Sequence, residues 1–204
     1  MKNKFKFPLV IIFIIVLILL VAGGMFILKK SKDEPSKIKV LDVIDGFSYE
    51  LKENDTELKK TIFKELEKLL KSKDVNYEKY AKLLSKIFIV DVFTLDNKIN
   101  KYDIGGVDFV LDSEKEKFKN IMSDTLYSYI ETKNDKRKQE LPEVKDISIT
   151  SLQSTTVTID SKEYLAYDIN LKWSYKKDLG YDTEGKVTVI KDDNKIYVVS
   201  YNKI

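Results

Sequence analysis

The chain contains one long stretch without charged residues, which runs from Phe7 to Leu28 near the N-terminus. Its centre, from Leu9 to Leu20, consists only of aliphatic and aromatic side chains. Twenty helical residues reach about 30 Å, which is the thickness of the hydrocarbon core of a bilayer. The sequence therefore predicts a single transmembrane helix over residues 8–28, with a short cytoplasmic tail over residues 1–7.

A cleaved signal peptide is the alternative interpretation of this segment. Three lysines lie within the first six residues, and small residues at 22–24 offer a cleavage site. The apolar stretch is, however, longer than a typical signal-peptide core of about 7–15 residues, which favours an uncleaved signal-anchor. Because lysines flank both ends of the segment, the positive-inside rule hardly distinguishes between the two orientations in the membrane. The acid-free tail favours a cytoplasmic N-terminus, so we expect a single-pass protein of the cell membrane with residues 29–204 outside the cytoplasm.

The composition excludes several kinds of chemistry. The chain has no His and no Cys, so disulfides, thiolate metal sites, cysteine nucleophiles and histidine-based triads are closed to it. The net charge of +3 is uneven, because residues 1–39 carry +6 and residues 40–204 carry −3. A mildly acidic domain lacks the basic surface of nucleic-acid-binding proteins. We therefore expect no nucleic-acid partner, no cofactor and no metal site.

Helical periodicity dominates the first half of the chain after a charged linker over residues 29–37. Residues 38–51 are irregular or strand-like. Apolar spacing predicts helices over 55–72, from Asn76 into the apolar run that ends at Leu95, and over 113–131. Possible capping boxes begin the first and third of these helices at Asn54 and Ser113. A short alternating strand is expected over 107–111.

The second half of the chain alternates with period two, which predicts antiparallel strands. The longest predicted strand covers 165–175, with shorter pieces at 147–149 and 157–159 before it and strands over 182–191 and 195–203 after it. Helices followed by strands indicate an α+β fold, in which three helices pack on a curved antiparallel sheet of four to six strands. Residues 38–204 are thus predicted to form one water-soluble domain.

This order of elements resembles the nuclear transport factor 2-like fold, a cone in which three helices lie in the bend of a curved sheet. The segments at 93–98, 103–110, 136–144 and 175–181 are similar to those of a group of membrane-anchored proteins from low-GC Gram-positive bacteria, to which we attach no activity. The layout also resembles the scaffold subunit of type IV secretion and conjugation machines. Folds of this shape serve enzymes, binding modules and scaffolds alike, so the resemblance does not select a function.

Asp91 is the most notable candidate site residue. On a helical wheel it shares a face with Tyr77, Leu84 and Phe88. A carboxylate among apolar side chains is costly unless it is hydrogen-bonded, and burial would raise its pKa. Asp91 could therefore line a pocket together with Tyr80 and Trp173, or it could simply bond to a tyrosine or a backbone amide.

No catalytic constellation is evident elsewhere in the sequence. The composition still permits a catalytic pair of a serine nucleophile and a lysine base, but no sequence feature identifies a particular serine as the nucleophile. The expected function is therefore that of a non-enzymatic domain outside the cytoplasm, which binds another envelope protein or itself in a cell-envelope complex. The alternative is an envelope sensor or small-ligand-binding module with a pocket near Asp91.

Overall fold

The computed structural model describes residues 38–134 and 136–204. The tail, transmembrane segment and linker predicted over 1–7, 8–28 and 29–37 lie outside these residues. Within the described ranges, no helix has the length and hydropathy needed to cross a membrane. Residues Val40–Ile204 form one compact unit.

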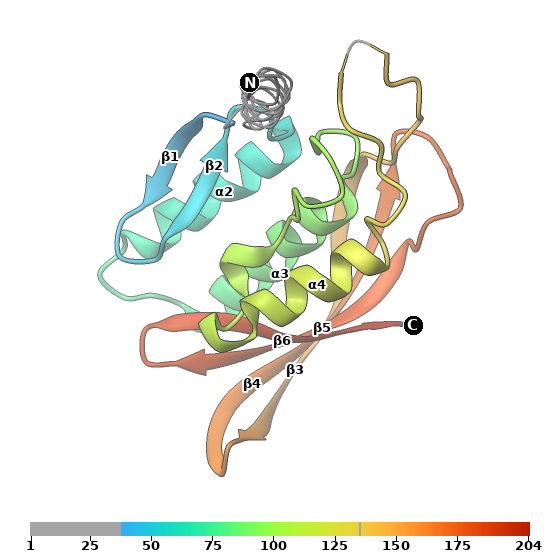
Figure 1. Cartoon of the computed structure of the whole chain (residues 1–204). Helices are drawn as coiled ribbons and strands as arrows, with labels where there is room; N and C mark the ends of the chain where they lie inside the picture. The colour runs from blue at the N-terminus through green and yellow to red at the C-terminus, as the bar shows by residue number, and fades with distance from the viewer. Residues whose placement is uncertain (1–37, 135) are drawn as a thin grey trace, which may run out of the picture. The chain divides into compact units, whose positions relative to one another are not determined.

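The described chain is α+β, as the sequence predicts. A hairpin of β1 (Val40–Ile44) and β2 (Tyr49–Lys52) comes first, and helices and a four-stranded sheet follow. The helices and 3-10 turns are α2 (Glu57–Leu70), α3 (Tyr77–Phe93), η1 (Val107–Phe109), η2 (Asp112–Glu114) and α4 (Lys115–Asp124). The sheet strands are β3 (Val144–Ile159), β4 (Lys162–Tyr175), β5 (Glu184–Asp192) and β6 (Lys195–Lys203). Figure 1 shows the three helices gathered on one side of the curved sheet.

The sheet is an antiparallel meander in the order β3-β4-β5-β6. Tight turns connect the strands of the meander at its two outer hairpins. Positive φ values occur there at Asp160 (47°), Ser161 (66°) and Asp193 (50°). From Tyr167 to Trp173 the side chains of β4 alternate as predicted, and Ile169 is fully buried, whereas Leu165 at the start of the predicted strand is 43% exposed. The core therefore lies between one face of the sheet and the helices.

Helix α3 forms the centre of the molecule. Asn76 caps its start by accepting a hydrogen bond from the amide of Lys79 at 2.8 Å, which confirms the predicted beginning. Its hydrophobic residues are buried almost all round, as expected for the apolar run that ends the helix. The helix continues to Phe93, so Asp91 is part of it.

Several local predictions are wrong. The first helix is capped by Thr56, whose hydroxyl accepts from the backbone amide of Lys59, whereas the side-chain amide of Asn54 donates to the carbonyl of Asn97 at 2.8 Å. Ser113 does not cap the third helix, since the 3-10 turn η2 precedes it. Where a strand was expected over 107–111, the chain forms the 3-10 turn η1, and Val110 after it makes one isolated parallel bridge to Val198 of β6.

Candidate functional site

Asp91 lies inside the molecule, and both of its carboxylate oxygens accept hydrogen bonds or pair with lysines. Its Oδ1 lies 2.9 Å from Nζ of Lys98 and 3.0 Å from Nζ of Lys59, while its Oδ2 accepts a hydrogen bond from the amide of Gly106 at 2.7 Å. Only 8% of Asp91 is exposed. Three donors thus hold a carboxylate that one helix places among apolar neighbours.

A second carboxylate extends this arrangement. Asp55 precedes α2 and lies 2.9 Å from Nζ of Lys59, and it also accepts a hydrogen bond from the amide of Lys52 at 2.7 Å. We call Asp55, Lys59, Asp91 and Lys98 the Asp91 network. All four side chains are buried, and their formal charges cancel. The network therefore ties α2, α3 and the loop after α3 together without leaving a net charge in the interior.

The electrostatics of the network differ from the sequence-based expectation for Asp91. Burial by itself raises the pKa of this carboxyl, but Lys59 and Lys98 outweigh it and hold the pKa well below its usual range. Burial would likewise lower the pKa of Lys98, yet Asp91 keeps it raised. The expected rise of the Asp91 pKa is therefore wrong. At neutral pH Asp91 is an ionised, fully bonded group, which is unsuited to general acid or base catalysis.

The loop around Gly105 and Gly106 packs its backbone against α3 and the Asp91 network. Gly106 has a φ of 78°, a conformation that favours glycine, and a Cβ there would lie 2.6 Å from Val92. The Tyr127 hydroxyl donates to the carbonyl of Val92 at 2.8 Å and accepts from the amide of Gly105 at 3.1 Å. The glycine pair thus provides a positive φ at Gly106 and allows the backbone to approach α3 closely.

Replacing Gly105 with alanine is expected to lower the free energy of unfolding by about 3 kcal/mol, the upper end of the usual cost of overpacking. The added Cβ would overlap the carbonyl of Asp91, whose carbon would be 2.6 Å away. The matched control is Gly46→Ala, where nothing lies within 4 Å and only the φ of 79° is unfavourable, at about 1–2 kcal/mol. Urea unfolding measures both variants, and equal losses would contradict the close approach at Gly105.

The three residues predicted to share a ligand site do not gather around one hollow. The hydroxyl of Tyr80, fully buried in α3, lies 2.6 Å from the hydroxyl of Tyr49, and burial raises its pKa to about 12. Trp173 packs on Phe93 at a ring distance of 5.0 Å and donates to the Tyr175 hydroxyl at 2.8 Å. Tyr80 and Trp173, like Asp91, are therefore hydrogen-bonded to other residues inside the core.

A hollow does exist, but at a different place. It has a volume of about 380 Å³ and is lined by α4, β6 and the tip of the β3-β4 hairpin. Phe88, Phe118, Ile121 and Val198 supply apolar walls, and Lys117 is among the polar lining residues. Asp91, Tyr80 and Trp173 are absent from this lining. The volume lies at the low end of the range for small-molecule pockets.

The two edges of the sheet differ strongly. At the β6 edge, Val110 forms a parallel bridge with Val198, and lysines begin and end the strand. At the other edge, β3 pairs only with β4, and no described segment pairs with its outer side. Thirteen consecutive residues of β3, from Ile147 to Ile159, carry no charge, although 34% of the chain is charged. From Ile147 to Ile159 the β3 edge is thus open and uncharged.

The sequence identified Asp91 but not its partners. Asp55 and Lys59 are spaced i,i+4 on a predicted helix, which is a recognisable pairing signal. Lys98 and Tyr127 gave no such signal, because Lys98 lies in the loop after α3 and Tyr127 in a turn 35 residues after Val92, outside any helical spacing to Asp91. In the described ranges, no group of three or more carboxylates gathers that could hold a metal ion.

Comparison with known proteins finds no match to this chain among protein-family models, curated proteins or solved structures.

Proposed function

We propose that this chain is a non-enzymatic protein-binding module of the cell envelope that assembles with partners through the β3 edge. In this proposal, residues 8–28 anchor it in the cell membrane and the domain that follows lies outside the cytoplasm. The observation that supports it best is the open, uncharged length of β3.

Open edge strands are normally protected in natural proteins. Lysine, proline or a covering segment usually prevents such strands from pairing with other chains. The β6 edge follows this rule, whereas β3 shows no such protection from Ile147 to Ile159 other than a register shift between Ile149 and Ser151. An edge of this kind binds extended segments by strand addition, in which backbone hydrogen bonds supply affinity.

The remaining features support assembly over catalysis. The chain lacks the usual neutral-pH base and nucleophile, His and Cys, and the Asp91 network has its charges already paired. The helices-on-sheet layout favours a nuclear transport factor 2-like cone, similar to the external domain of type IV secretion scaffolds. We infer a comparable role as an assembly component, held close to the membrane by the short linker over 29–37.

In-cell crosslinking tests the proposal. A photo-crosslinking amino acid at Thr156, an exposed residue of β3, is expected to capture one dominant envelope protein or a second copy of the chain. The control position is Lys73, which is exposed in the connection between α2 and α3 and is not part of the sheet. Absence of any specific product at Thr156 would contradict the proposal.

A small-ligand-binding module is the second candidate, and the hollow beside α4 is the observation that favours it. Its apolar walls would suit an apolar or amphiphilic ligand. Ile121 lines it and is 51% exposed, so Ile121→Glu places a charge in the hollow at little cost to folding. A compound that raises the melting temperature of the wild type but not of this variant would support the second candidate.

A further inference from the structure

We infer that β3 pairs with β3 of a second copy of this chain, antiparallel and about a two-fold axis at Thr155. This inference rests on the proposed function, because it names the partner that the same edge receives. The two sheets would then join into one continuous eight-stranded sheet.

The regular part of β3 sets the register. From Ser151 to Ile159 the strand pairs with β4 without any register shift, whereas a shift lies between Ile149 and Ser151. Nine regular residues are therefore free to pair on the outer side. Centring the axis on Thr155 uses all nine, and it places Ser154 of each copy opposite Thr156 of the other.

The backbone of an open antiparallel edge is complementary to itself. A two-fold axis perpendicular to the sheet brings the same row of donors and acceptors onto its own copy, which is the isologous contact typical of dimers. It also keeps equivalent faces on the same side, so the helices of both copies would cover one face of the joined sheet.

The side chains of this stretch permit self-pairing. Like charges directly opposite each other destabilise strand pairs, and they are the usual obstacle when an edge meets its own copy. Between Ser151 and Ile159 there are none. Around the axis, Ser154, Thr155 and Thr156 would meet as hydroxyl pairs, which are favourable across strands. An unrelated acidic or basic strand would find no complementary charge here.

The tip of the hairpin supplies an independent reason for a partner. Pairing of β5 with β4 ends at Ala166, so the hairpin segments 156–159 and 162–165 extend beyond the rest of the sheet as two strands alone. Figure 1 shows this hairpin reaching past β5 and β6. An isolated two-stranded ribbon is marginally stable in water. Pairing with a second copy would turn it into a four-stranded segment.

Cysteine crosslinking tests the register directly, because the chain has no cysteine of its own. In the full-length chain in membranes, Thr155→Cys would place two thiols across the axis at a separation that a disulfide can bridge. The control Thr158→Cys, on the same strand, would lie about 20 Å from its counterpart. We expect the oxidised dimer of Thr155→Cys to exceed that of Thr158→Cys by about tenfold or more. Equal yields, or no dimer at Thr155, would overturn the inference.

A charge-pair test separates self-pairing from chance contact. Ser154→Lys with Thr156→Lys would place two lysines opposite two lysines and is expected to abolish the Thr155→Cys crosslink. Ser154→Lys with Thr156→Glu has the same two sites but would place each lysine opposite a glutamate, so the crosslink should persist. Both original side chains are exposed, and unchanged fluorescence of the single tryptophan, Trp173, would verify folding. Equal effects of the two variants would contradict pairing in this register.

The two proposals fail in different ways. If Thr155→Cys gives no dimer while the photo-crosslinker at Thr156 captures one identified envelope protein, self-pairing is wrong and the protein-binding function stands. If neither position yields a product, both are wrong. A self-crosslink at Thr155 that shows the charge-pair pattern supports both.

Discussion

Replacing Asp91 with asparagine is expected to lower the free energy of unfolding by about 3–5 kcal/mol, the usual cost of removing one member of a buried ion pair. Asparagine keeps the shape of the side chain but removes the charge that Lys59 and Lys98 share, at 3.0 and 2.9 Å. Two buried ammonium groups would then face one remaining carboxylate, Asp55. Urea unfolding followed by the fluorescence of Trp173 measures the loss.

Asp168→Asn is the matched control for this prediction. Like Asp91, Asp168 accepts a hydrogen bond from an uncharged donor, the Thr188 hydroxyl at 2.7 Å, and pairs with a lysine, Lys186 at 3.3 Å. Its side chain is 31% exposed on the outer part of the sheet, so solvent screens the pair. We expect a loss of about 1 kcal/mol or less. Comparable losses at the two positions would show that the Asp91 network contributes no more than a surface pair.

The pH dependence follows from the direction of the Asp91 pKa. Because the folded state holds this pKa below its unfolded value of about 3.9, the network stabilises the protein above that pH, and the contribution is lost as the pH falls further. The difference in stability between wild type and Asp91→Asn should therefore be constant from pH 7 to about pH 5 and shrink below about pH 4. A difference that grows on acidification would contradict the assignment.

The sequence predicted those parts of the fold that depend on local pattern. The alternation of β4 and the apolar stripe of α3 both survive in the structure, because each buries one continuous set of side chains. The capping boxes at Asn54 and Ser113 did not form, since several nearby polar residues can satisfy a helix start and tertiary contacts choose among them.

Strand β3 was harder to predict, and the reason is informative. The sequence indicated only short pieces at 147–149 and 157–159, whereas the strand is continuous from Val144 to Ile159. The Ser- and Thr-rich residues between these pieces do not alternate, because both faces of an open edge strand are largely exposed. The exposure that obscured the strand is thus also the feature on which the proposed interaction surface rests.

The Asp91 site was predictable only in part. Helical periodicity placed Asp91 on an apolar face, which is correct. Where a pocket was expected, Lys59, Lys98 and Gly106 lie against the carboxylate of Asp91. These groups come from three separate segments, and no local pattern in the sequence could join them. The resulting site is a structural support for the helices.

Replacing Tyr127 with phenylalanine is expected to cost about 2–3 kcal/mol, because its loss leaves a buried amide and a buried carbonyl without their partner. The hydroxyl bonds the amide of Gly105 at 3.1 Å and the carbonyl of Val92 at 2.8 Å, and the side chain is 0% exposed. The sequence predicts a helix over 113–131, which would include this residue. In the structure α4 ends at Asp124, and the following turn, in which the amide of Tyr127 bonds the carbonyl of Met122 at 3.0 Å, carries Tyr127 inward.

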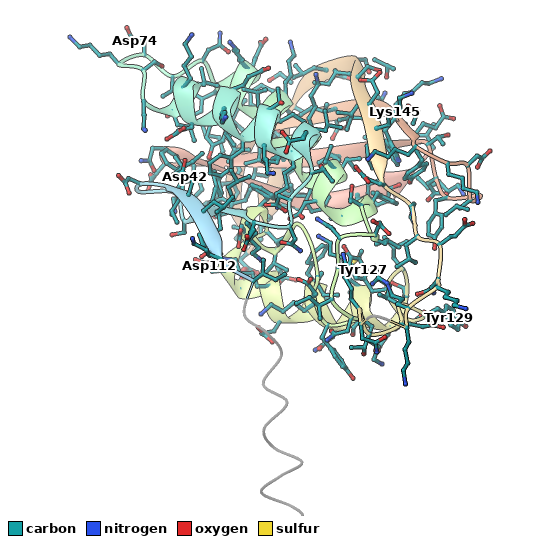
Figure 2. All side chains as sticks on the ribbon, turned by 90° about the horizontal axis from the view of Figure 1, so that it is seen from above. Asp42, Asp74, Asp112, Tyr127, Tyr129 and Lys145 are labelled. Carbon is teal, nitrogen blue, oxygen red and sulfur yellow. The ribbon has the colours of Figure 1, made fainter. Side chains whose placement is uncertain are left out.

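Tyr129→Phe is the control for this last prediction, since the same atom is removed two residues away. Tyr129 is 87% exposed, and Figure 2 places it at the margin of the molecule while Tyr127 lies further in. Its substitution should change stability by no more than about 0.5 kcal/mol. Equal losses for both variants in urea unfolding would contradict the buried, bonded position of Tyr127. A large loss at Tyr127 alone would show that this hydroxyl fixes the Gly105 loop against α3, and with it the Gly106 amide that donates a hydrogen bond to Asp91.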